Sequence, residues 1–214
     1  MAGVTQETFL ARIRNAVAAR RENEALPTDL AAARVVPPSA DAVALFMERV
    51  TDSAMSVARI GDEAALVEKV VAIIAEVNAK RVLIAPESFP ARAQIVAKLR
   101  EQSLELLDPG DKRQAFEADV GITGVASAVA ETGSIHMTSG GPRRRLASLA
   151  APCHIAIVRA DQILADLLDW AARPCDGRPA CEVLVSGPSK TADIELALVI
   201  GVHGPRAEHI LIVG

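Results

Sequence analysis

Short β-branched runs alternate with amphipathic helical segments from residue 41 onward, and this alternation restricts the fold more than any other feature of the sequence. Strand-like runs separated by helices predict βαβ units and a parallel sheet with right-handed connections. The expected helices are residues 41–53, 63–78 and 89–101, and the expected strands are 56–60, 81–85, 104–107 and 119–123.

The second half of the chain has a different texture, with many glycines and prolines between residues 124 and 158. Its turns separate short runs of strand character, so this part is expected to be rich in tight connections. The expected strands are 126–130, 134–138, 154–158, 182–186 and a last buried strand at 209–213, and the expected helices are 161–171 and 192–199.

The N-terminal segment predicts a separate amphipathic helix over residues 6–21, because Phe9, Ile13 and Val17 recur every four residues and Thr5 can cap its start. A short helix with so narrow an apolar stripe is marginal alone, so it needs a docking surface on the main body or on a partner. Residues 22–41 contain three prolines and are interpreted as a tether. We therefore expect a helix and linker over residues 1–40 and one domain over 41–214.

Composition excludes several classes of protein. The 214 residues carry a net charge of −4, and with four Phe, one Trp and no Tyr they offer few rings for stacking on bases, which argues against nucleic-acid binding. Cys153, Cys175 and Cys181 contain no CxxC pair, so they predict reduced thiols rather than a disulfide framework or a zinc site. No apolar run is long enough to span a bilayer, and we expect a soluble cytoplasmic protein.

The first of three polar segments is residues 130–134, where Glu131, Thr132 and Gly133 interrupt two apolar runs. A carboxylate held at the end of a strand can act as a nucleophile or as a general acid or base. The alternative is a glutamate that forms a turn and caps a backbone amide, and the sequence leaves both open.

The second polar segment is residues 140–146, in which two glycines precede three arginines that end at Arg145. Guanidinium groups bind carboxylates or phosphates in bidentate geometry, so an anionic ligand is one interpretation. A charge run that only faces solvent is the other.

The third segment is residues 185–193, interpreted as a strand end that opens a helix. Backbone amides at a helix start, two hydroxyls and a lysine can cradle an anion, whereas a simple helix cap is the alternative. A nucleotide-binding P-loop is excluded because glycines are missing from the required positions. The candidate ligand-binding residues here are Gly187, Ser189, Lys190, Thr191 and Asp193.

The four histidines show no spacing typical of a metal site. His203, within the turn of residues 201–205, is a candidate acid or base, although a loop histidine can also simply face solvent.

Together these segments resemble one family. The matching motifs are Ala130-Glu-Thr-Gly-Ser134, Arg145-Leu-Ala-Ser-Leu149, Pro152-Cys-His-Ile155, Ser186-Gly-Pro-Ser-Lys-Thr-Ala-Asp-Ile-Glu195 and Gly201-Val-His-Gly-Pro205. In this order they are similar to the lactate utilisation protein C family, whose members carry a LUD domain. The resemblance implies an α/β protein with a Rossmann-like parallel sheet and an antiparallel insertion, similar to the NagB/RpiA/CoA transferase-like fold.

The resemblance also implies a function. Members of this family take part in oxidising L-lactate to pyruvate beside two partner proteins, and iron–sulfur clusters are expected on those partners. This chain lacks the cysteine runs that a cluster needs, so we expect no cofactor in it. Residues 131–133 resemble the glutamate nucleophile of CoA transferases, which makes Glu131 and His203 the candidate catalytic residues.

Three functional hypotheses stay open. In the first, a subunit of a lactate-oxidising complex binds a small anion in a pocket. In the second, a non-catalytic assembly subunit docks its N-terminal helix on a partner, and in the third a free-standing transferase or ligase acts on an acyl or phosphorylated metabolite. The first pocket would be lined by Glu131, Thr132, Gly133, Arg145, Gly187, Ser189, Lys190, Thr191, Asp193 and His203. The sequence does not decide whether the chain forms a homodimer.

Overall fold

The computed structural model of the protein describes residues 5–18, 29–37, 40–140, 145–173, 179–191 and 199–214. The chain divides into two compact units, residues 1–33 and residues 34–214. The first unit contains helix α1 (Gln6–Ala18) and the short 3-10 helix η1 (Ala31–Ala33). The Thr5 hydroxyl oxygen accepts a hydrogen bond from the Thr8 amide at 3.3 Å, which confirms the predicted helix cap.

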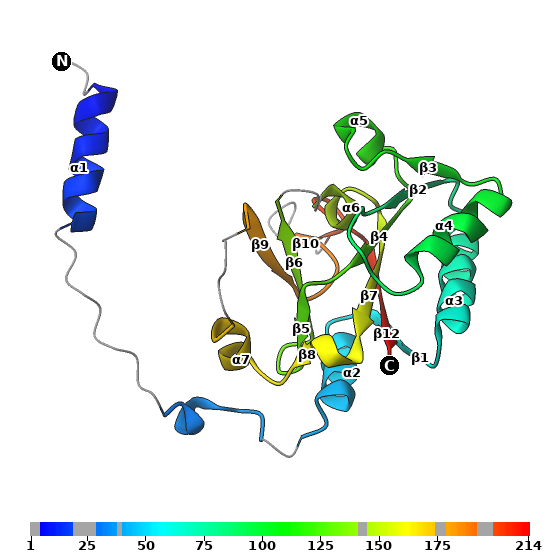
Figure 1. The fold of residues 1–214 in the computed structure, drawn as a ribbon, viewed down its shortest axis with the longest axis horizontal. Helices are drawn as coiled ribbons and strands as arrows, with labels where there is room; N and C mark the ends of the chain where they lie inside the picture. The colour runs from blue at the N-terminus through cyan, green and yellow to red at the C-terminus, as the bar shows by residue number, and fades with distance from the viewer. Residues whose placement is uncertain (1–4, 19–28, 38–39, 141–144, 174–178, 192–198) are drawn as a thin grey trace. The chain divides into compact units, whose positions relative to one another are not determined.

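The second unit is built on a six-stranded parallel sheet with the strand order β1-β12-β7-β4-β2-β3 (Figure 1). The predicted strands therefore pair as expected for an α/β fold. Their bounds are β1 Ser56–Ile60, β2 Arg81–Ile84, β3 Glu105–Leu107, β4 Val120–Gly124, β7 Cys153–Arg159 and β12 Ala207–Val213.

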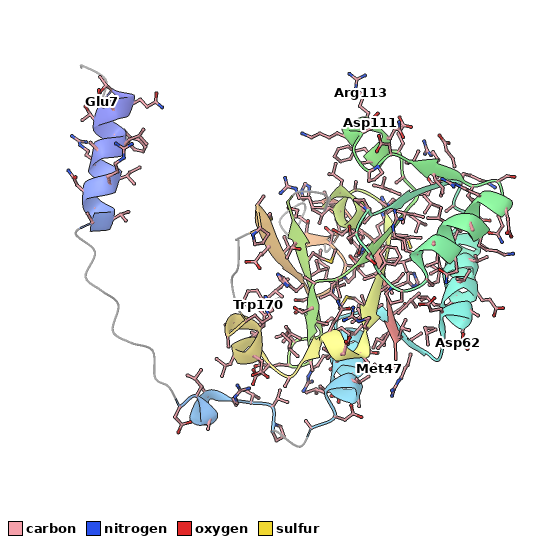
Figure 2. All side chains as sticks on the ribbon, in the orientation of Figure 1. Glu7, Met47, Asp62, Asp111, Arg113 and Trp170 are labelled. Carbon is pink, nitrogen blue, oxygen red and sulfur yellow. The ribbon has the colours of Figure 1, made fainter. Side chains whose placement is uncertain are left out.

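Helices α3 (Glu63–Glu76) and α4 (Arg92–Glu101) lie together on one side of this sheet (Figure 1). The apolar faces of both helices pack against the sheet. Leu66 of α3, Ile95 of α4 and Ile155 of β7 are fully buried in one hydrophobic cluster. The Asp62 carboxylate starts α3 by accepting the Ala65 amide at 2.8 Å (Figure 2). The short helices α5 (Lys112–Ala115) and α6 (Leu146–Leu149) join the core near β4.

The other side of the parallel sheet is covered by helix α2 (Ala42–Asp52) and by a second sheet. This second sheet has the order β8-β5-β6-β9, and β6 pairs antiparallel with both β5 and β9. The insertion of an antiparallel part into a parallel α/β protein confirms the predicted fold class. The bounds are β5 Ser127–Val129, β6 Ser134–Ser139, β8 Ile163–Leu164 and β9 Cys181–Val185.

One predicted helix needs correction. Residues 161–171 do not form one helix but a 3-10 turn η2 (Ala160–Gln162), strand β8 and a short helix α7 (Leu167–Ala171). The helix is interrupted because Ile163 pairs with Ala128 of β5, and it begins only after Asp166, whose carboxylate caps the Asp169 amide.

The helix predicted at residues 192–199 is tested only at its last residue. Val199 belongs to strand β11 (Val199–Ile200), which pairs with β10 (Lys190–Thr191), so the chain is extended on both sides of this segment. Residues 192–198 lie outside the described part of the chain.

Candidate functional site

The turn between β5 and β6 contains Glu131, Thr132 and Gly133 and lies against α2. Gly133 has a φ of +62°, and a Cβ atom there would come within 2.6 Å of the Arg49 carbonyl carbon and 2.7 Å of the Val50 amide nitrogen. Any larger residue would meet helix backbone, which cannot move aside. The glycine of this motif is therefore needed for the turn to reach α2.

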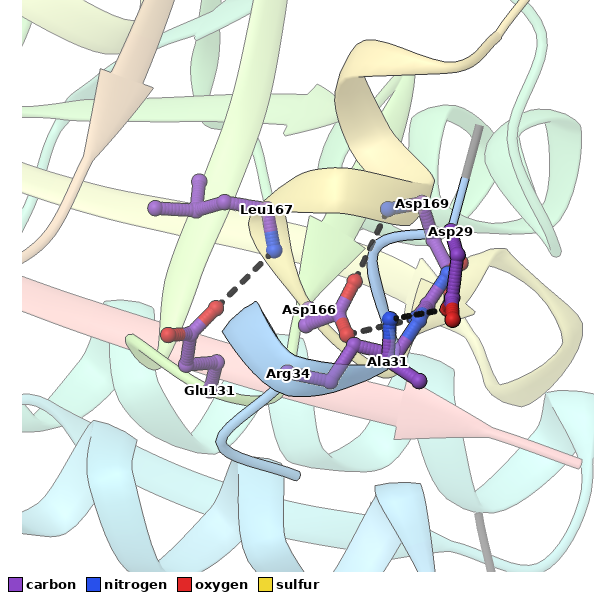
Figure 3. A network of polar contacts seen from close by, with 7 residues as sticks. All are labelled: Asp29, Ala31, Arg34, Glu131, Asp166, Leu167 and Asp169. Carbon is purple, nitrogen blue, oxygen red and sulfur yellow. Dashed lines mark hydrogen bonds and ion pairs between the residues drawn. The ribbon is translucent and has the colours of Figure 1, made fainter. Parts of the chain in front are cut away.

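The Glu131 carboxylate caps a helix. Its Oε2 atom accepts a hydrogen bond from the Leu167 amide at 3.0 Å, in the first turn of α7 (Figure 3). This is the capping role that the sequence offered as the alternative to catalysis. A carboxylate at this position is stabilised by the amides at the helix start.

A buried carboxylate lies beside Glu131 at the same helix start (Figure 3). Asp166 is 1% exposed and accepts hydrogen bonds from the Asp169 amide at 2.8 Å and from Arg34 Nη1 at 2.6 Å. The other terminal nitrogen of Arg34 contacts Asp169 at 2.7 Å, and this hydrogen bond is the largest cause that raises the Arg34 pKa. Arg34 thereby links the start of the second unit to α7 through two ion pairs.

An open cavity of about 390 Å³ lies between α2 and residues 35–37, 40 and 41, and Glu131 is one of its lining residues. Its other charged groups are Asp41, Glu48 and Arg49, so carboxylates outnumber cations. Lys190 is not among the residues that line it. The structure thus does not bring the predicted carboxylate and the predicted ammonium into this cavity.

Hydroxyl groups connect the Glu131 turn to a second predicted segment. Thr132 Oγ1 lies 2.7 Å from Ser134 Oγ, which lies 2.6 Å from Ser186 Oγ. Gly187 follows Ser186 with a φ of +145°, and a Cβ atom there would come within 2.9 Å of the Ser53 carbonyl oxygen at the end of α2. Segments more than fifty positions apart in the sequence therefore meet beside one helix.

The remaining loops of the predicted site meet at Ser189. Its amide donates to the Pro205 carbonyl at 2.9 Å, its carbonyl accepts from the Gly201 amide at 2.8 Å, and its hydroxyl accepts from the His203 amide at 3.3 Å. Lys190 pairs with Ile200 in the adjoining ladder, and Thr191 pairs with Val199. We call residues 186–191 and 201–205 the loop pair; within it the side chains of Lys190 and His203 are exposed.

Arg145 lines a different cavity from Glu131. It is exposed at the start of α6 and lines a cavity of about 10 Å³ together with Ser148 and Cys181. A cavity of this size holds about one water molecule. Its neighbours 141–144 and the predicted residues Cys175 and Asp193 lie outside the described part of the chain.

Two buried polar clusters were not expected from the sequence. In the first, His154 Nδ1 lies 2.6 Å from Glu208 Oε2, and His154 Nε2 lies 2.9 Å from Thr123 Oγ1. These residues come from three neighbouring strands and are at most 2% exposed. The signal in the sequence was a histidine and a glutamate near the starts of two otherwise apolar strands.

The second cluster lies on the outer face of the second sheet. Arg173 Nη1 donates to His136 Nδ1 at 3.0 Å and to Ser127 Oγ at 3.1 Å. An arginine can only donate, so the proton of the neutral His136 ring is on Nε2, 3.2 Å from Glu182 Oε1. Ser127 Oγ lies 3.3 Å from the same Nδ1 atom.

We also searched the described residues for a metal site and for a membrane-spanning helix. In the part of the chain that the structure describes, no three His, Cys, Asp or Glu side chains gather so that they could hold a metal ion. No helix in the same residues is long and apolar enough to cross a membrane.

Comparison with known proteins matches the LUD domain to residues 43–213. The chain is 38% identical over 146 residues to lactate utilization protein C of Deinococcus radiodurans, which covers 64% of each chain. It is also 38% identical over 117 residues to a protein of the same name from Shouchella clausii, covering 50% of this chain and 51% of that protein. The matched part thus spans between half and two thirds of these relatives.

A solved structure supports the same relationship. The crystal structure of a DUF162 family protein from Deinococcus radiodurans superimposes with a TM-score of 0.61 at 27% sequence identity, covering 83% of this chain and all of that one. The family match extends over the whole parallel sheet and the second sheet with the candidate loops. The chain therefore belongs to the LUD domain family.

Proposed function

We propose that this protein is a subunit of a system that oxidises L-lactate to pyruvate, and that its loop pair binds a small carboxylate. The names of the two lactate utilization relatives support the metabolic role. The observation that carries the site is the set of three hydrogen bonds through which Ser189 joins residues 186–191 to residues 201–205. These bonds hold a lysine, a hydroxyl and a histidine on one pair of loops.

The chemistry of the loop pair suits an anionic substrate. The exposed Lys190 ammonium supplies the positive charge for a carboxylate, and the hydroxyls of Ser189 and Thr191 supply donors. Oxidation of lactate to pyruvate breaks the hydroxyl O–H bond and the Cα–H bond. The exposed His203 is the group that accepts the hydroxyl proton, and the Cα hydrogen leaves with the electron pair to an acceptor on a partner subunit. We place the electron-accepting iron–sulfur clusters on partner subunits.

A second candidate function is a non-catalytic subunit of the same system. The observation that favours it is the hydrogen bond from the Leu167 amide to Glu131, which gives this carboxylate a structural task. In that case Glu131 holds α7 in place, and catalysis takes place on the partners.

Growth on lactate distinguishes the two functions. A strain that lacks this gene is complemented with the wild-type chain, Lys190→Ala, Lys190→Arg or Glu131→Gln, and each purified protein is tested for stabilisation by lactate and pyruvate in thermal unfolding. We expect Lys190→Ala to lose both growth and stabilisation, and Lys190→Arg to keep them. If Lys190→Ala supports growth as wild type does, the anion site is refuted.

Glu131→Gln separates catalysis from capping. Glutamine can still accept the Leu167 amide, so the variant is expected to fold normally. Loss of growth by a folded Glu131→Gln protein would assign a proton-transfer role to this carboxylate. Full growth of this variant leaves helix capping as the task of Glu131. The non-catalytic subunit is supported if Lys190→Ala also grows like wild type while the gene deletion does not.

A further inference from the structure

The cavity beside Glu131 is a candidate binding site for a helix. Helix α2 buries Phe46 and Val50 in the core and turns its opposite side toward the cavity. Ala44, Leu45, Glu48 and Arg49 line the cavity, and their spacing of three and four residues is that of one helix face. The small Ala44 side chain lies at one edge of this face, where it permits close approach of another helix. We call this surface the α2 groove.

The charge of the α2 groove is negative at its rim. Asp41, Glu48 and Glu131 line it, and the single cation, Arg49, already contacts Glu48 at 3.5 Å and Asp52 at 3.3 Å. Val35 is 77% exposed and adds apolar surface to the opposite wall. A lining that combines apolar side chains with three carboxylates fits the apolar face of a basic amphipathic helix.

Helix α1 has the complementary face. Its Phe9, Ile13 and Val17 are 57%, 45% and 67% exposed, and none of its residues is buried. Helical geometry places these three side chains in one stripe with Arg12 on one side of it and Arg14 on the other. The stripe presents anchors at i, i+4 and i+8, the pattern with which helices bind apolar grooves.

We propose that the α2 groove of one copy receives α1 of a second copy, so that two chains exchange their N-terminal helices in a symmetric dimer. Apolar side chains of α1 fill the groove, and Arg12 and Arg14 pair with the carboxylates at its rim. Reciprocal exchange forms this contact twice about a two-fold axis, so the dimer buries twice the area of one contact. Packing in the groove stabilises α1, which is too short to be stable alone. Twelve residues, 19–30, separate α1 from η1, and a chain of that length can span at most about 40 Å, which allows α1 to reach a neighbouring copy.

The test uses the full chain and measures its mass in solution across a concentration series. The wild type is expected to dimerise, whereas Ile13→Asp in the helix and Ala44→Arg in the groove each weaken the dimer by at least about tenfold. Both positions are exposed, so the variants should fold, which circular dichroism checks. Asn15→Asp, on the opposite face of α1, is the matched control and should still dimerise.

Mixing the two variants gives the decisive result. Ile13→Asp keeps an intact groove and Ala44→Arg keeps an intact helix, so an equimolar mixture should form a heterodimer through one remaining contact. Reversal of charge on both sides, Arg12→Glu with Glu48→Arg, should restore part of the affinity that Arg12→Glu alone removes. A wild type that stays monomeric at all concentrations, variants that dimerise like wild type, or a mixture without heterodimer would each overturn the proposal.

Discussion

Replacing Glu208 by alanine should destabilise the protein more than any surface substitution. Glu208 is 2% exposed, and its carboxylate, which can only accept, lies 2.6 Å from Nδ1 of the fully buried His154. The two residues are direct partners in the ladder between β12 and β7, at the centre of the parallel sheet. Alanine would leave the imidazole N–H in the core without an acceptor and would open a void beside it.

The expected cost follows from these two losses. Breaking a buried polar pair by removing one partner costs about 3–5 kcal/mol. Domains of this kind have a total stability of roughly 5–15 kcal/mol, so the variant loses a large part of it. The midpoint of thermal unfolding should fall by roughly 6–20 °C.

Two further variants separate the contributions of the individual hydrogen bonds to the cost of Glu208→Ala. Glu208→Gln keeps a carbonyl oxygen that can accept from His154, so we expect a cost of only about 1 kcal/mol. Thr123→Val removes the hydroxyl that lies 2.9 Å from Nε2 while keeping the side-chain shape, and should cost about 1–3 kcal/mol.

Urea unfolding measures all three variants. It is followed by circular dichroism and by the fluorescence of the single tryptophan, Trp170 on α7 (Figure 2). Coincident transitions from the two probes justify a two-state free energy. If Glu208→Ala costs less than about 1 kcal/mol, or no more than Glu208→Gln, the buried pair does not hold the strands as argued here.

Three further outcomes are expected. Gly121→Ala should cost about 3 kcal/mol or more in urea unfolding, because the new methyl group would overlap the Ala147 backbone carbonyl; a cost below 1 kcal/mol would contradict this packing. Burial lowers the pKa of His209 below its ordinary value of 6.5, so the unfolded chain takes up its proton first as the pH falls. Stability should therefore decline below pH 6.5, and His209→Asn should reduce that decline, whereas an unchanged pH profile would refute it. Burial, with the nearby Glu208, raises the pKa of Cys153 to about 11, so alkylation of the native protein near pH 8 should label Cys181 and spare Cys153, as peptide mass spectrometry can check.

The candidate site shows how far sequence reasoning reaches. The motif around Glu131 and the one around Ser186 were identified as polar breaks in apolar runs, and the structure joins them through Ser134. Their distance from Arg145 could not be read from the chain, because it depends on how α6 packs against the two sheets.

The two buried histidine clusters were missed for a related reason. A histidine in an apolar strand is visible in the sequence, but its partners are contributed by other strands. His154 meets Glu208 only because β7 and β12 are neighbours, although 54 positions separate the two residues. Strand order is set by packing of the whole sheet and not by any local pattern.

The alternation of short strand-like runs with runs of period 3.6 determined the α/β class of this protein, since period two gives a strand one apolar face and period 3.6 gives a helix one apolar face. The N-terminal helix, its cap and the alternating core elements were all predicted in this way. The tertiary structure decided those features that depend on contacts between residues far apart in the sequence. Pairing of Ile163 with Ala128 interrupts the helix expected at 161–171, and contact of Gly133 and Gly187 with α2 brings two remote loops together. Such contacts gain their free energy from long-range packing, which outweighs local preference.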